Sequence, residues 1–152
     1  RKDLSQQTVA FYIGGARKAN VILKQQSQEL SNQNKFNCMQ KMVDLVWVLK
    51  SELESGSIEN FGKILHENWE LKRSLSEGIT NSYVDDLYNE AISAGAIGGK
   101  LLGAGGGGFM IFHVPSSEIK MKVKKRFNNL REVNLGLVQS GSGIIFSQEA
   151  SL

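Results

Sequence analysis

The chain has 152 residues, of which 41% are apolar and 22% charged, a composition that excludes a disordered or fibrous protein and fits one globular domain. No segment approaches the roughly 20 apolar residues of a membrane-spanning helix, so we expect no membrane contact. The net charge of +3 is set by residues 116–131, and charge confined to one segment argues weakly for nucleic-acid binding. The single cysteine, Cys38, cannot form an internal disulfide, which favours a reducing, cytoplasmic location.

The first half of the chain predicts one strand followed by helices. Branched and aromatic side chains fill residues 8–13, which indicates a strand. A helix is expected to begin at Asn81 or Ser82, whose side chains can accept a free backbone amide, and to end before Gly95. Between the strand and this helix, residues recur at helical spacing in three stretches, which predicts three helices, the last of them continuing up to Gly78. Their expected inward faces are Ala16, Ala19, Leu23, Gln26 and Leu30 for the first; Met39, Met42, Val43, Val46, Leu49 and Leu53 for the second; and Ile58, Phe61, Leu65, Trp69 and Leu75 for the third.

The second half predicts strands around one more helix. Strands over residues 99–102 and 109–114 flank a run of glycines. A helix is expected after Ser116 or Ser117, with Ile119, Val123, Phe127 and Leu130 on its apolar face. The alternation of Val133, Leu135 and Leu137 and the apolar residues 144–146 predict two further strands.

Strands joined by short turns, with the helices grouped together, indicate an α+β domain with an antiparallel sheet. No repeat or polar linker interrupts the chain, so we expect residues 1–152 to form a single domain. Because the first residue is Arg1, we expect the chain to be a fragment of a longer protein.

Seven of the eleven residues from 98 to 108 are glycine. A flexible hairpin tip is one explanation, although a hairpin needs only one or two glycines to turn. The alternative is a loop whose bare backbone approaches a ligand or another loop and turns its amides toward an anion. Three familiar phosphate loops fail on context. The dinucleotide fingerprint must open a helix, a Walker A motif needs Ser or Thr where Leu101 stands, and a protein kinase needs a catalytic loop that this chain lacks.

The glycine run, read with its flanking residues as GAIGGKLLGAGGGGF over residues 95–109, closely resembles the third signature motif of the GHMP kinases. Residues 11–19 (FYIGGARKA), 65–72 (LHENWELK) and 75–79 (LSEGI) resemble the D-glycero-D-manno-heptose 7-phosphate kinase branch. The resemblance implies the ferredoxin-like carboxy-terminal domain of such a kinase, with helices packed on one side of the sheet. It also implies that the amino-terminal ATP-binding domain, with its phosphate loop and acidic residues, lies outside this chain and is its partner.

The implied activity is transfer of the ATP γ-phosphate to the anomeric hydroxyl of a heptose 7-phosphate or a related sugar. ATP and Mg²⁺ would be bound mainly by the amino-terminal domain, so we expect no catalytic residue and no metal site in this chain, and no activity from the chain alone. A homodimer is left open. The nucleotide pocket would be lined by Gly103, Ala104, Gly105, Gly106, Gly107 and Gly108.

Three basic residues are candidates for binding the substrate. Arg17 follows the Gly14-Gly15 turn, where a guanidinium could hold a sugar phosphate in a bidentate manner, and an exposed arginine is the alternative. Lys72 (with Arg73) and Lys100 could also meet substrate, or simply face solvent on a helix and a strand edge.

Other features receive structural interpretations. Asp85 and Asp86 are expected to complement a helix dipole, and the basic residues 120–126 to form the solvated face of a helix. The alternatives to a kinase domain are a regulatory or dimerisation module, or an RNA-binding sheet on which bases stack. The nominated stacking residues are Phe109, Phe112 and Phe146.

Overall fold

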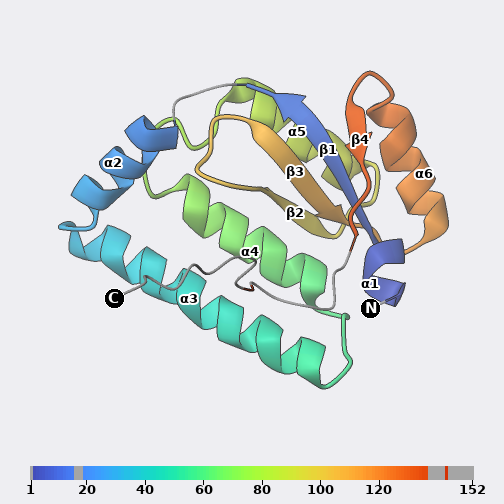
Figure 1. Cartoon of the computed structure of the whole chain (residues 1–152), viewed down its shortest axis with the longest axis horizontal. Helices are drawn as coiled ribbons and strands as arrows, with labels where there is room; N and C mark the ends of the chain where they lie inside the picture. Colours follow the sequence, from blue (N-terminus) through green and yellow to red (C-terminus); the bar gives the residue numbers. More distant parts are fainter. Residues whose placement is uncertain (1, 16–18, 137–142, 144–152) are drawn as a thin grey trace, which may run out of the picture.

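The computed structural model describes residues 2–15, 19–136 and 143 (Figure 1). Arg17, Leu137 and the strand expected over residues 144–146 lie outside the described residues. In chain order the elements are α1 (Lys2–Gln6), β1 (Thr8–Gly14), α2 (Ala19–Glu29), α3 (Gln33–Glu54), α4 (Phe61–Arg73), α5 (Ser82–Ser93), β2 (Gly98–Leu101), β3 (Gly108–His113), α6 (Ser117–Arg126) and β4 (Arg131–Val133).

The four strands form one antiparallel sheet in the order β2-β3-β1-β4. The central strand β1 pairs with β3 on one side and with β4 on the other, so that Ala10 stands opposite both Ile111 and Val133. With helices between β1 and β2 and between β3 and β4, the chain follows the βαββαβ order of a ferredoxin-like fold. The predicted α+β class with an antiparallel sheet is confirmed.

The hydrophobic core lies between one face of the sheet and the helices α5 and α6 (Figure 1). Phe11 of β1 and Phe112 of β3 point to this face, and the ring of Phe127, which follows α6, lies 5.0 Å and 6.0 Å from theirs. Tyr88 of α5 packs 5.9 Å from Phe112. Burying rings of this size supplies much of the apolar area that drives folding.

Helix α4 runs beside the edge strand β2, and glycine makes the close approach possible. A Cβ atom on Gly98 would collide with the carbonyl group of Gly62. A Cβ atom on Gly62 would in turn lie 2.7 Å from the Cβ of Ile97. The indole of Trp69 on α4 is fully buried and packs against Tyr88, with 6.2 Å between the ring centroids. The main chains of helix and strand are therefore in direct contact.

Helix α3 packs on α4 and has no fully buried residue. Asn32 caps its first turn by accepting hydrogen bonds from the amides of Asn34 and Lys35. Its inward side chains include Met39 and Met42, which pack against the core while staying partly exposed. Although α3 is long, no helix in the part of the chain that the structure describes is both long and apolar enough to cross a membrane.

The inward faces expected for α2 and α3 are partly wrong. In α2 the core takes Ile22, whereas Leu23 is exposed. In α3, Val43 and Val46 are exposed although they share the expected apolar stripe with Met39. Both helices have adjacent apolar residues, so periodicity alone leaves the rotation of the helix about its axis undecided.

Several expected element boundaries are also wrong. The helical pattern up to Gly78 ends at Arg73, and Leu75 is buried in the core from the loop that follows. Likewise, Phe127 and Leu130 follow the end of α6, and Leu135 lies beyond the three-residue strand β4. A loop residue can fill the core as well as a helical one, so apolar spacing overestimates element length. The local caps are confirmed: Asn81 accepts from the amide of Val84, and Ser116 from that of Ile119.

Candidate functional site

The glycine run forms the hairpin between β2 and β3, as the sequence predicts. The amide of Leu102 donates a 2.8 Å hydrogen bond to the carbonyl of Phe109, which closes the hairpin over residues 103–108. We call residues 102–108 the glycine hairpin. Its five glycines, Gly103 and Gly105 to Gly108, all have positive φ, a conformation that side chains with a Cβ rarely adopt.

Two other turns of the same chain pack against the glycine hairpin. The amide of Gly106 donates a 2.8 Å hydrogen bond to the carbonyl of Ile79, and a Cβ on Gly105 would lie 2.7 Å from the Cα of Ile79. On the other side, a Cβ on Gly107 would lie 2.5 Å from the carbonyl oxygen of Gly14. The sequence predicts that the bare backbone of this run approaches a ligand or another loop. In the structure it approaches two other loops of the same chain.

The remaining glycines have open surroundings. No atom of the described residues would lie within 4 Å of a Cβ on Gly103 or Gly108, so the positive φ is the reason for glycine at these two positions. Whether the glycine hairpin lines a nucleotide pocket stays a prediction.

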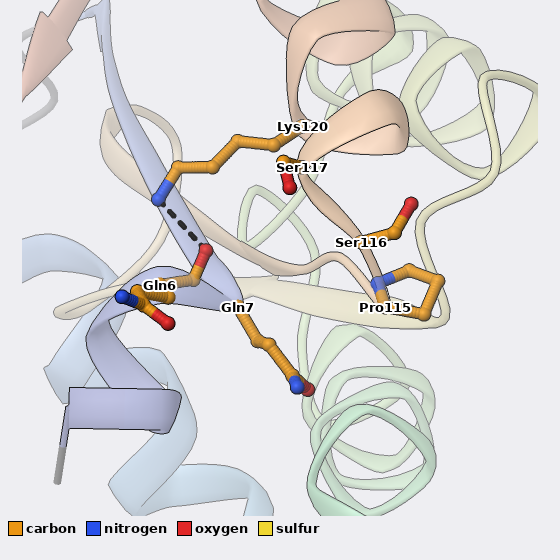
Figure 2. Close-up of a pocket in the computed structure, with 6 residues that line it drawn as sticks. All are labelled: Gln6, Gln7, Pro115, Ser116, Ser117 and Lys120. Atoms are coloured by element: carbon orange, nitrogen blue, oxygen red, sulfur yellow. Dashed lines mark hydrogen bonds between the residues drawn. The ribbon is translucent and has the colours of Figure 1, made fainter.

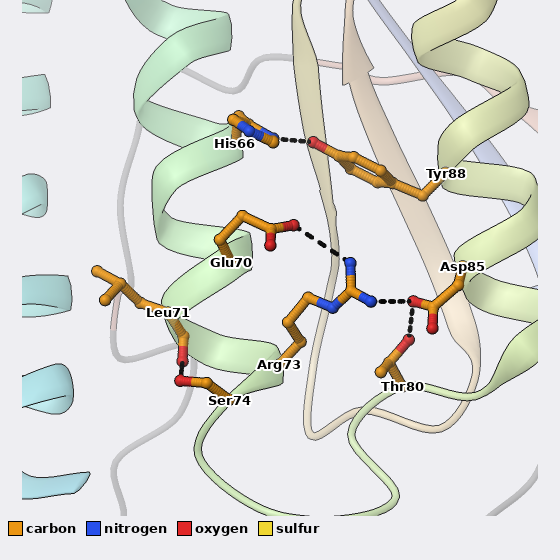
Figure 3. A network of polar contacts seen from close by, with 8 residues as sticks. All are labelled: His66, Glu70, Leu71, Arg73, Ser74, Thr80, Asp85 and Tyr88. Atoms are coloured by element: carbon orange, nitrogen blue, oxygen red, sulfur yellow. Dashed lines mark hydrogen bonds and ion pairs between the residues drawn. The ribbon is translucent and has the colours of Figure 1, made fainter. Parts of the chain in front are cut away.

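A polar network holds the loop that carries Ile79 (Figure 3). Arg73, at the end of α4, forms ion pairs of 3.3 Å with Glu70 and 3.1 Å with Asp85 of α5. The hydroxyl of Thr80 donates a 2.6 Å hydrogen bond to the same Asp85 carboxylate. Asp85 lies in the first turn of α5, as expected for an acidic residue that complements the helix dipole, and it also pairs with Arg73. Arg73 is partly exposed, and two carboxylates contact it.

Above this network, His66 and Tyr88 join α4 to α5. The Nδ1 atom of His66 lies 2.7 Å from the hydroxyl oxygen of Tyr88 (Figure 3). Burial raises the pKa of Tyr88 to about 12, so the phenol stays protonated at neutral pH and can donate to the imidazole. These residues stabilise the helix pair that carries the candidate site.

Lys72 and Lys100 meet beside the glycine hairpin. The Nζ of Lys72, in the last turn of α4, donates to the carbonyl oxygen of Gly103, and the Nζ of Lys100 on β2 donates to the side-chain oxygen of Asn68. Both side chains are half-buried. Burial and, secondarily, the charge of Lys100 lower the pKa of Lys72 to about 8, and burial also lowers that of Lys100. The structure thus brings these two predicted substrate residues together.

Arg17, the third predicted substrate residue, lies outside the described residues. Asn68 is a residue that sequence reasoning missed. Its spacing of four from Lys72 on a helix was the available signal, because residues four apart share a helix face. Ile79 was missed as well, since nothing local indicates that its carbonyl would accept from Gly106.

The basic helix α6 faces another part of the surface. Lys120 donates to the carbonyls of Ser5 (3.2 Å) and Gln6 (3.0 Å) at the end of α1, beside a pocket of about 470 Å³ (Figure 2). The pocket lies where β1 begins and β3 ends, whereas the glycine hairpin lies at the other end of these strands. Lys122 and Lys124 pair with Glu118 and Glu132. These lysines therefore have structural partners.

The nomination of Phe112 for base stacking is wrong. Its ring is fully buried in the core, because it alternates with residues on the opposite face of the sheet. Phe109 is exposed and lies 5.2 Å from Tyr12, and Phe146 is outside the described residues. The nominated set of stacking rings therefore lacks Phe112.

The donor set near the hairpin suits an anion better than Mg²⁺. Magnesium prefers carboxylate and other oxygen ligands, whereas the charged groups that meet at the hairpin are the two lysines. Within residues 2–15, 19–136 and 143, no three His, Cys, Asp or Glu side chains are grouped as metal ligands would be. The residues present do not fit a magnesium site, whereas two ammonium groups suit an anion such as a phosphate.

Comparison with known proteins places this geometry in a family. The model of the family "GHMP kinases C terminal" matches residues 49–129, which include α4, α5, the glycine hairpin and α6. A curated relative, the D-glycero-alpha-D-manno-heptose 7-phosphate kinase of Campylobacter jejuni, is 30% identical over 112 residues, covering 74% of this chain and 33% of the relative.

Solved structures share the fold. L. major mevalonate kinase superposes with a TM-score of 0.68 at 18% identity, covering 80% of this chain and 37% of that one. Streptococcus pneumoniae phosphomevalonate kinase, in complex with phosphomevalonate and AMPPNP, gives 0.67 at 22% identity, covering 85% and 38%. The chain spans about a third of the length of the curated heptose kinase that it matches. With the family model covering more than half of its residues, the chain belongs to the GHMP kinase C-terminal domain family.

Proposed function

We propose that residues 1–152 are the carboxy-terminal domain of an ATP-dependent sugar kinase. In the complete, cytoplasmic protein, an amino-terminal domain would bind ATP and Mg²⁺. The γ-phosphate would be transferred to the anomeric hydroxyl of a heptose 7-phosphate or a related sugar. The observation that carries the proposal is the glycine hairpin, fixed in place by Ile79 and Gly14 and bordered by Lys72 and Lys100. The heptose 7-phosphate kinase relative supports the substrate class.

The proposed contribution of this domain is positioning and electrostatics. Phosphoryl transfer depends on alignment of the reactants and on stabilisation of charge spread over the phosphoryl oxygens. The glycines of the hairpin carry no side chains, so a second domain could approach its main chain closely at Gly108, while the side chains of Lys72 and Gln26 already contact the carbonyls of Gly103 and Ala104. The lysines supply positive charge at the same place. Residues that bind the metal and activate the hydroxyl belong, in this proposal, to the amino-terminal domain.

A substrate screen with the full-length protein tests the proposal. The protein is incubated with ATP and, separately, heptose 7-phosphate, fucose, galactose and mevalonate, and the products are followed by phosphorus NMR. We expect a new anomeric phosphate signal with a sugar, strongest with the heptose 7-phosphate. Residues 1–152 alone serve as the control and should give no turnover. Transfer to none of these acceptors would contradict the proposal.

A further inference from the structure

Lys72 and Lys100 reach one point of the surface from two different elements. Helix α4 runs beside β2, so Asn68 of the helix faces Lys100 of the strand, and Lys72, one turn further along, faces Gly103. The contact between Gly62 and Gly98 fixes this alignment at the other end of the strand. Main-chain packing therefore determines how close the two ammonium groups come.

In the part of the chain that the structure describes, the two ammonium groups have no acidic partner. Each ion pair found among the described residues joins other side chains, and the acceptors that Lys72 and Lys100 use are an uncharged carbonyl and an uncharged amide. Their positive charges repel each other in a half-buried position, which contributes to the low pKa of Lys72. Nearby Arg73 differs, because Glu70 and Asp85 neutralise it. Positive charge without a local counter-ion attracts anions.

Asn68 holds the ammonium group of Lys100 in a defined position. The residue is buried, and its Nδ2 donates a 3.4 Å hydrogen bond to the carbonyl of Met42 on α3. This contact leaves the side-chain oxygen turned toward Lys100, so three elements (α3, α4 and β2) determine where the Lys100 ammonium lies. An ordered cation is a better binding group than a freely moving one, because less conformational entropy is lost when the ligand binds.

We propose that Lys72 and Lys100 together bind one phosphate group. A phosphate dianion has enough oxygens to accept from both ammonium groups at once, and its charge would remove their mutual repulsion. At present the two ammonium groups donate to the carbonyl oxygen of Gly103 and the side-chain oxygen of Asn68. A bound phosphate would accept in place of these neutral oxygens or alongside them. The identity of the molecule rests on the proposed function: the phosphate belongs either to the sugar acceptor or to ATP.

Three variants of the full-length enzyme test this site: Lys72→Met, Lys100→Met and, as the matched control, Lys63→Met. Lys63 is an exposed lysine of the same helix α4 that contacts Asn60 and lies about 2.5 helical turns before Lys72. KM is measured for the phosphorylated sugar, for the same sugar without its phosphate, and for ATP. Lys100→Gln replaces Lys100→Met if the latter fails to fold, as judged by circular dichroism.

The outcomes separate the two sources of phosphate. If the pair binds the acceptor, KM for the phosphorylated sugar rises about 10- to 100-fold in the Lys72 and Lys100 variants, and the values for ATP and the unphosphorylated sugar do not change. If the pair binds the nucleotide, the KM for ATP rises instead. Values equal to those of Lys63→Met for all three compounds overturn the phosphate site.

A second measurement keeps the site testable if the proposed function fails. Should the wild-type protein transfer no phosphoryl group to any sugar, inorganic phosphate serves as the probe. We then expect phosphate to raise Tm relative to chloride at equal ionic strength in wild type and in Lys63→Met, and this rise to disappear in Lys72→Met. A wild-type protein without a phosphate-specific rise overturns the site as well.

Discussion

The backbone amide of Gly106 donates a 2.8 Å hydrogen bond to the carbonyl of Ile79, which ties the glycine hairpin to the loop between α4 and α5. This contact joins two segments that are far apart in sequence. The hairpin is therefore held by the same loop that Arg73, Thr80 and Asp85 stabilise. The conformation of the glycine hairpin and the stability of the loop between α4 and α5 therefore depend on each other.

Replacing Gly105 by Ala tests this contact. The residue has φ +122°, and the new Cβ would lie 2.7 Å from the Cα of Ile79, so the main chain must shift. We expect the free energy of unfolding to fall by about 2–4 kcal/mol, from backbone strain and overpacking together. Urea unfolding followed by circular dichroism measures it.

The matched control is Gly103→Ala. This residue has φ +80° with open space around the Cβ position, so strain alone should cost about 1–2 kcal/mol. Equal losses in the two variants would mean that the contact with Ile79 contributes nothing.

Gly98→Ala should separate α4 from β2. The added methyl group would collide with the carbonyl group of Gly62, and neither main chain can move without disturbing the core. We expect a loss above about 2 kcal/mol in urea unfolding. Gly136→Ala, where no atom of the described residues lies within 4 Å of the Cβ position, should stay within about 0.5 kcal/mol of wild type. A mild Gly98→Ala variant would show that helix and strand can move apart freely.

Asp85→Asn should weaken the loop network. The change removes the negative charge of Asp85, which Arg73 contacts at 3.1 Å. The same charge lies in the first turn of α5, where it is favourable to the helix dipole. Because the pair is partly exposed, the expected loss is about 1 kcal/mol, and it should shrink in about 1 M salt. Asp86→Asn, on the exposed side of the same helix, is the control and should have little effect. A salt-independent loss would argue against an electrostatic cause.

Stability should rise with pH in the window set by Lys72. Burial and the charge of Lys100 lower the pKa of Lys72 in the folded chain to about 8, from an ordinary value of 10.5. Between these two values the unfolded chain binds more protons than the folded one, so the free energy of unfolding increases as the pH rises. Lys100, whose pKa is also lowered, contributes in the same direction.

Urea unfolding near pH 7.5 and near pH 9.5 measures this gain. We expect Lys72→Met to show a smaller increase than wild type between the two values, because the group that titrates has been removed. Phosphate binding by the same residue should weaken over the same window, as the ammonium loses its proton. An increase of equal size in the variant would mean that other groups cause it.

The sequence predicts the local features of this fold well. Asn81 and Ser116 cap their helices as expected, because a cap depends on a few neighbouring residues. The hairpin follows from its glycines. The contacts from Lys100 to Asn68 and from Gly106 to Ile79 could not be foreseen, since they depend on how α4 and the following loop pack on β2. The position of Arg17 relative to the lysines remains a prediction from the family resemblance.

The two tryptophans lie in opposite environments, and this gives the domain two built-in optical probes. Trp69, on α4 beside the candidate site, has no exposed surface, whereas Trp47 on α3 is 62% exposed. An aqueous quencher should reach the second indole and not the first. Emission of Trp69 would thus follow loosening of the helix that carries Lys72, while emission of Trp47 would respond to any molecule that covers the outer side of α3.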